Sequence, residues 1–134
     1  MGEYIFAELS RRAGKGAEIA VSSSAVSLEE IGNDVYPPAK RELLAHGIPC
    51  PSRAARRITP KEIEEYDYLL CMDESNLRWL SRISPLATGK ACLLGEYGLG
   101  GKEIEDPWYT GRFGRVYDEI YTCCETLLEE ILRG

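Results

Sequence analysis

The chain has 134 residues, which suits one domain, and its 44% hydrophobic and 28% charged residues allow it to bury a core and stay in solution. The formal net charge of −6 argues against a nucleic-acid surface, and no apolar run approaches the roughly 20 residues of a membrane helix. Five cysteines without Cys-x2-Cys spacing accompany one histidine, so we expect no metal site and interpret them as reduced, mostly buried thiols of a cytoplasmic protein.

The first half of the chain is predicted to contain two helices and one strand. Residues 2–13 have an amphipathic helical pattern, and the apolar, partly β-branched segment 17–23 is predicted to be a strand. After a long loop, a second helix is predicted over 38–46, with Leu43 and Leu44 facing inward. These elements already mix helix with strand.

The second half repeats this alternation. Thr59 begins a capping box and a short helix, and the near-continuous apolar run 67–72 is typical of a buried parallel strand. Asp73 then caps a further helix, 90–95 forms another short strand, and 113–132 is a long amphipathic helix. We therefore predict an α/β fold with a parallel sheet.

Cys50 and Arg56 are separated by five residues, the spacing of a cysteine-phosphatase loop. However, a helix end precedes Cys50 instead of a strand, and Pro49 and Pro51 remove amide donors that a phosphate would need. Arg57 also stands where a hydroxyl residue would stabilise the thiolate. We interpret this stretch as a surface connection, and keep Cys50 as nucleophile of a rearranged loop as an alternative.

Several motifs occur in an order that points to one family. They are "AHGIPCPSRAARRIT" (45–59), "YDYLLCMDESNLR" (66–78), "LLGEY" (93–97), "DPWYTG" (106–111) and "VYDEIYTCCETLLEEIL" (116–132). Over essentially its whole length the chain resembles the low-molecular-weight protein tyrosine phosphatases of bacterial type. Each motif alone would be weak, but their order makes the match specific.

The resemblance implies a three-layer α/β fold, in which a four-stranded parallel sheet has helices on both faces. The family's catalytic Cys-x5-Arg-Ser loop lies between its first strand and first helix, a place that falls just before Met1 here. We therefore expect one domain over 1–134, incomplete at the N-terminus, that lacks the first, central strand and the nucleophile. As written, this chain is expected to be catalytically inactive.

The resemblance also implies a reaction and some of its residues. The full protein would hydrolyse phosphotyrosine on proteins, or small aryl phosphates, through a cysteinyl-phosphate and without cofactor or metal. Asp106 would be the general acid, and Trp108 and Tyr109 would form a wall of the slot for the aryl ring. Glu29 stands where many members carry the opposite aromatic wall, which suggests a different substrate preference.

Two further residues correspond to positions that support the catalytic loop. Ser23 matches a serine that hydrogen-bonds this loop, although it is also one of several serines that could face solvent. Arg53 replaces a histidine that often braces the loop, and it could bind loop carbonyls or face water.

The fold leaves other functions open. The same fold could serve a non-catalytic binding protein, or an arsenate reductase, although the latter needs further redox cysteines near its nucleophile. The sequence does not indicate the oligomeric state.

Overall fold

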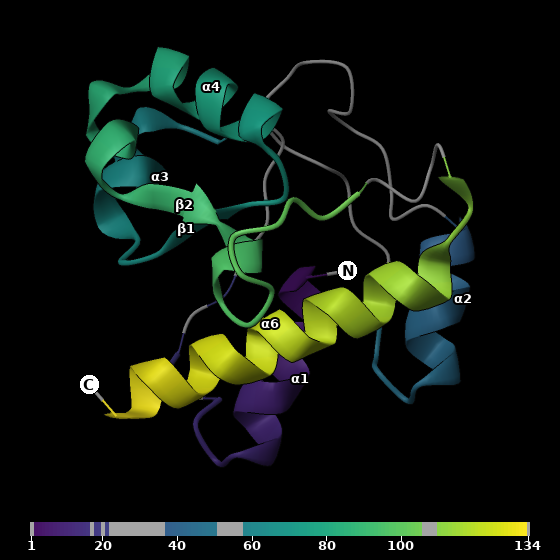
Figure 1. Ribbon diagram of the computed structural model, residues 1–134. Helices are drawn as coiled ribbons and strands as arrows, with labels where there is room; N and C mark the ends of the chain where they lie inside the picture. Colours follow the sequence, from purple (N-terminus) through teal and green to yellow (C-terminus); the bar gives the residue numbers. More distant parts are fainter. Residues whose placement is uncertain are drawn as a thin grey trace.

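The structure, a computed structural model, combines helices with a short parallel sheet (Figure 1). The described residues are 2–16, 18–19, 21, 37–50, 58–105 and 110–133. In chain order, the elements are α1 (Gly2–Arg12), α2 (Pro37–Ala45), α3 (Pro60–Glu65), β1 (Leu69–Cys71), α4 (Glu74–Ile83), the 3-10 helix η1 (Pro85–Gly89), β2 (Ala91–Leu93), the 3-10 helix η2 (Leu94–Glu96) and α6 (Phe113–Arg133). The predicted α/β class is confirmed.

The two described strands pair in parallel, at the places where the sequence predicted strands over 67–72 and 90–95. Each is shorter than predicted, and their register aligns Leu69 with Ala91, Leu70 with Cys92 and Cys71 with Leu93. Parallel strands joined through α4 and η1 form the crossover unit typical of α/β folds.

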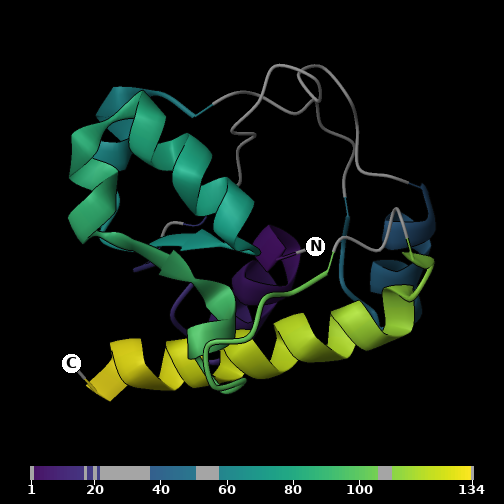
Figure 2. The same cartoon turned by 45° about the horizontal axis from the view of Figure 1, so that its top comes forward.

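The sheet separates two hydrophobic cores, which gives the three layers visible in Figures 1 and 2. On one face, Leu69, Cys71 and Leu93 pack against α3 and α4. On the other face, Leu70 and Met72 contact a larger core built mainly by α1, α2 and α6. Alternate residues of β1 therefore serve opposite cores, as the two-residue period of a strand requires.

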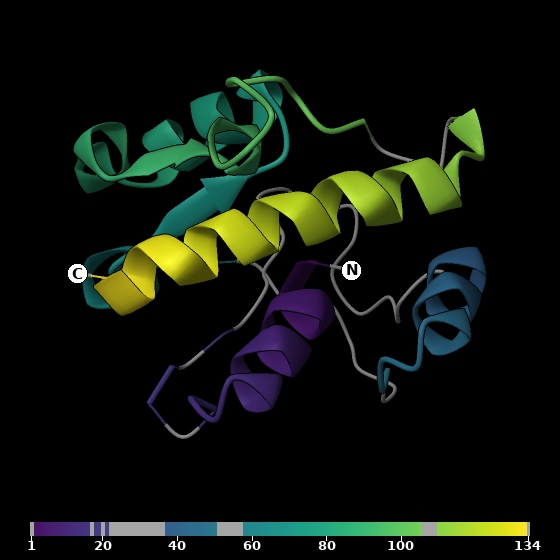
Figure 3. The ribbon, with the colours of Figure 1, turned by 60° about the horizontal axis from the view of Figure 1, so that its bottom comes forward.

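Helix α6 is the main support of the larger core. Both α1 and α2 pack on it, although they lie far from it in the sequence (Figure 3). Its buried side chains face this core, and Ile131 is partly buried. The buried residues are Val116, Tyr117, Ile120, Cys123, Cys124, Leu127 and Leu128. The interpretation of the cysteines as mostly buried thiols is thus confirmed for Cys123 and Cys124.

The capping box predicted at Thr59 is present at the start of α3. The Thr59 hydroxyl oxygen accepts a hydrogen bond from the backbone N–H of Glu62 at 3.3 Å, and the Glu62 carboxylate accepts one from the Thr59 N–H at 3.2 Å. Two backbone donors that a helix start leaves unpaired are therefore satisfied. Helix α2 ends at Ala45, and Gly47 in the turn that follows has a φ of 74°, which is readily adopted only by glycine.

We expect Thr59→Ala to lower the free energy of unfolding by about 1 kcal/mol, because it removes the hydroxyl acceptor of the capping box. Urea unfolding monitored by circular dichroism would measure the change as a shift of the midpoint at constant slope. Thr59→Ser keeps the acceptor and is the matched control. Equal midpoints for the alanine and serine variants would contradict the role of the cap.

Two predictions fail in the described residues. Leu44 was expected to face inward, but its exposed fraction is 57%, whereas Leu43 is fully buried. A strand was predicted over 17–23, but at its start Glu18 and Ile19 both donate backbone hydrogen bonds to the Lys15 carbonyl; residues 17, 20, 22 and 23 lie outside the described residues. These bonds to Lys15 occupy the backbone donors that a strand would direct to a neighbouring strand.

Candidate functional site

The carboxyl end of β1 lies beside the first residue of α1 (Figure 2). A Cβ placed on Gly2 would lie 3.3 Å from Cε of Met72, the residue that follows β1. Asp73 comes next, and its carboxylate caps α4 by accepting a hydrogen bond from the Asn76 N–H at 2.9 Å. Open α/β folds bind their ligands at this edge of the sheet, so the residues that reach it are candidates for the functional site.

The segment 102–105 is fixed to the same edge by several contacts. The Ile104 N–H donates to the Met72 carbonyl at 2.8 Å, and the Ile104 side chain is 1% exposed. The Glu103 carboxylate accepts a hydrogen bond from the Glu74 N–H at the start of α4, at 3.1 Å. These contacts position Glu105, which directly precedes the predicted acid Asp106 in the sequence.

The residues on both sides of 106–109 are tied to one another. Glu105 Oε2 lies 3.0 Å from Arg112 Nη2 in an ion pair, and the Arg112 N–H donates to the Thr110 hydroxyl at 3.3 Å. The pKa of Glu105 is held below its usual value, mainly by a hydrogen bond with the Thr110 hydroxyl and further by the charge of Arg112. Burial acts in the opposite direction. We call Glu105, Thr110 and Arg112 the loop clamp.

The loop clamp was not predicted from the sequence. It joins residues 7 positions apart across an Asp-Pro segment, and no helix or strand period links them. The sequence shows only that Glu105 directly precedes Asp106 and that Arg112 directly follows Gly111. The sequence also did not predict the close contact at Gly95. The backbone of Gly95 lies against the Lys102 carbonyl, and no local sequence pattern indicates this contact.

The residues that the resemblance assigned to the site lie outside the described residues. They are Ser23, Glu29, Arg53, Asp106, Trp108 and Tyr109. Their roles therefore stay predictions. The described residues that adjoin Asp106 and Tyr109 are those of the loop clamp.

The cysteines have the surroundings of packing residues. Burial raises the pKa of Cys71 and of Cys123 to about 11 and that of Cys124 to about 12, and it also raises the pKa of Cys92. A nucleophilic cysteine needs the opposite shift, because the thiolate is the reactive form. Cys50 is 9% exposed and packs in the larger core, which argues against its role as a nucleophile.

The comparison with protein families decides the identity of the fold. The family model described as "Low molecular weight phosphotyrosine protein phosphatase" matches residues 1–134. The chain belongs to this phosphatase family. The human low molecular weight phosphotyrosine protein phosphatase is 41% identical over 116 residues, which cover 82% of this chain and 73% of the human protein.

Bacterial members of the phosphatase family are similar over more of the chain. The low molecular weight protein-tyrosine-phosphatase YfkJ of Bacillus subtilis is 29% identical over 134 residues, which cover 98% of this chain and 86% of YfkJ. The crystal structure of YfkJ superposes with a TM-score of 0.91 at 28% identity, covering 98% of this chain and 85% of that structure. The predicted family and its α/β fold are therefore confirmed.

Two other kinds of site are absent from the described residues. Among them, no helix is both long and apolar enough to cross a membrane. Within the same part of the chain, no three His, Cys, Asp or Glu side chains are grouped so that they could hold a metal ion.

Proposed function

We propose that this phosphatase-family chain supplies the general acid and the scaffold of a protein tyrosine phosphatase. Its substrates would be phosphotyrosine on proteins or small aryl phosphates, in the cytoplasm. One observation carries the proposal: the Ile104 N–H donates a hydrogen bond to the Met72 carbonyl at the sheet edge where α1 begins. The chain continues from there toward Asp106, and the nearby start of α1 favours an anion.

The proposed reaction has two steps. A cysteine thiolate attacks phosphorus, the bond from phosphorus to the tyrosine oxygen breaks, and Asp106 gives its proton to that oxygen. Asp106 then takes a proton from water as the water attacks phosphorus and the thiolate leaves. Proton donation matters because a phenolate is a poor leaving group without it.

The remaining roles follow from the family resemblance. Trp108, Tyr109 and Glu29 would line the slot for the aryl ring, and Ser23 and Arg53 would support the loop that carries the nucleophile. This loop has no counterpart in the sequence at the family's position, and the only Cys-x5-Arg spacing is the one at Cys50. We therefore propose that the 134 residues alone do not turn over substrate and need the family's strand and loop ahead of α1.

A fusion experiment tests this proposal. We expect that the strand and Cys-x5-Arg-Ser loop of a family member, fused ahead of Gly2, produce hydrolysis of p-nitrophenyl phosphate and of a phosphotyrosine peptide. The 134-residue chain without the fusion should show no hydrolysis above the buffer rate. A fused chain in which serine replaces the loop cysteine is the matched control, and it should be inactive while it still binds phosphate.

Two outcomes would contradict the proposal. Activity in the unfused chain that Cys50→Ser abolishes would make Cys50 the nucleophile. A fused chain that is folded by circular dichroism but inactive would favour a non-catalytic binding protein of the same fold.

A further inference from the structure

A cavity of about 460 Å³ opens where three helical segments meet, and the proposed reaction does not use it. Its described lining comes from the end of α1, the turn after α2 and the middle of α6, namely Arg12, His46, Tyr117, Asp118, Tyr121 and Thr122. Arg12 is the last residue of α1, so it lies about 15 Å along the helix from Gly2 and the candidate active site. The cavity is broadly open to solvent.

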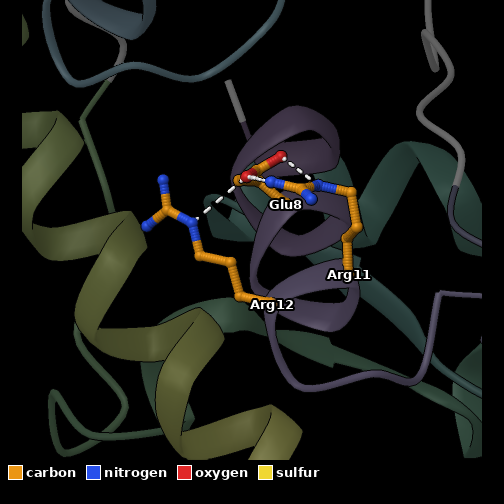
Figure 4. A network of polar contacts seen from close by, with 3 residues as sticks. All are labelled: Glu8, Arg11 and Arg12. Carbon is orange, nitrogen blue, oxygen red and sulfur yellow. Dashed lines mark hydrogen bonds and ion pairs between the residues drawn. The ribbon is translucent and has the colours of Figure 1, made fainter.

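The guanidinium of Arg12 is held in place by a buried carboxylate. The Glu8 side chain is only 7% exposed, and its Oε1 accepts a hydrogen bond from Arg12 Nε at 3.1 Å. Arg11 binds the same carboxylate from the other side. Figure 4 shows the two terminal nitrogens of Arg12 pointing away from Glu8 and toward α6. This orientation leaves a pair of donors for an anion, and a carboxylate matches their geometry.

An aromatic wall stands beside this cation. The His46 ring stacks on Tyr117 with centroids 3.8 Å apart and 9° between the planes, and Tyr121 lies 5.9 Å from Tyr117. The Glu42 carboxylate lies 3.0 Å from His46 Nε2 and fixes the imidazole. Tyr117 is buried, whereas His46 and Tyr121 keep exposed surface for a further ring.

The charges of the lining select the kind of ligand. Asp118 and Thr122 are exposed and lie four residues apart on α6, so they occupy the same face of the helix. A phosphate dianion would be repelled by Asp118, which shares the cavity with Arg12. A ligand with a carboxylate and an adjacent ammonium group could pair its carboxylate with Arg12 and its ammonium with Asp118.

We propose that this cavity binds an aromatic α-amino acid. Its carboxylate would bind the terminal nitrogens of Arg12, its ammonium would face Asp118, and its ring would contact His46 and Tyr121. The ligand would thus occupy a site separate from the one where phosphate chemistry is proposed.

Titration of the 134-residue chain with L-phenylalanine, followed by amide NMR shifts, tests this site. We expect saturable shifts at positions 12, 46, 118, 121 and 122. Arg12→Gln should weaken binding by about 10- to 100-fold, because it removes a charge-assisted pair of hydrogen bonds. Arg11→Gln is the matched control: Arg11 binds the same Glu8 carboxylate but does not line the cavity, so binding should change less than about threefold.

Two truncated ligands separate the contacts. Phenethylamine lacks the carboxylate, so its affinity should be lower than that of phenylalanine and should not fall further in Arg12→Gln. Phenylpropanoate lacks the ammonium, so Asp118→Asn should not weaken its binding, whereas that variant should weaken phenylalanine binding. Asp118→Asn also tests the site if Arg12→Gln fails to fold.

Three results would overturn the proposal. These are the absence of saturable binding at millimolar phenylalanine, equal losses for the Arg11 and Arg12 variants, and inorganic phosphate binding at these positions more tightly than phenylalanine.

Discussion

Asp106→Asn in the fused phosphatase domain is expected to lower kcat/KM for phenyl phosphate by about 10²- to 10⁴-fold, the usual contribution of a positioned general acid to the step that releases the phenol. The loss should be much smaller for p-nitrophenyl phosphate, because p-nitrophenolate leaves without needing a proton. The basic limb of the kcat/KM profile should also disappear, since asparagine cannot deprotonate. Steady-state kinetics with both substrates across pH would measure these changes.

Asp67→Asn is the matched control for the acid. Asp67 is exposed and precedes β1, so it lies at the end of the strand opposite to the candidate site. Its substitution should leave the kinetics unchanged. An Asp106→Asn variant whose kcat/KM falls by the same factor on both substrates would show that Asp106 does not donate the proton to the leaving group.

Gly95→Ala is expected to lower the free energy of unfolding by about 3 kcal/mol or more, because a side chain there collides with backbone. A Cβ on residue 95 would lie 1.7 Å from the Lys102 carbonyl oxygen and 2.9 Å from its carbon. Backbone cannot move aside as a flexible side chain can, so η2 or the segment 102–105 must shift. Urea unfolding of the 134-residue chain would measure the loss.

Gly89→Ala provides the control for Gly95→Ala. No atom lies within 4 Å of the Cβ that this substitution would add at Gly89. Its effect on stability should stay within about 0.5 kcal/mol, as for other surface substitutions. Similar midpoints for the two alanine variants would show that the segment 102–105 can shift without lowering the free energy of unfolding.

Local sequence signals predicted most of the described fold. The capping residues Thr59 and Asp73 mark helix starts correctly, and the apolar runs at 67–72 and 90–95 mark the paired strands. The failure at Leu44 has a simple reason: adjacent residues point about 100° apart around a helix, and α2 buries only a narrow face, on which Leu43 lies.

The candidate site was less predictable than the fold. Asp106 could be named only through the family resemblance, because an Asp-Pro pair by itself is common in turns. The contacts that fix its neighbours join distant residues, such as Glu74 and Glu103, which are 29 positions apart. Such pairs depend on tertiary structure, and a hydrophobic period does not reveal them.

The two cores differ in how much of the chain must exist before they can form. In the described part of the chain, the core between the sheet and α3 and α4 consists of residues from Ile58 to Leu93, so it can assemble from one continuous stretch. The larger core joins α1 to α6, the first and last helices of the chain. During synthesis, the apolar face of α1 therefore stays uncovered until α6 has left the ribosome. The segment from Ile58 to Leu93 is expected to fold first.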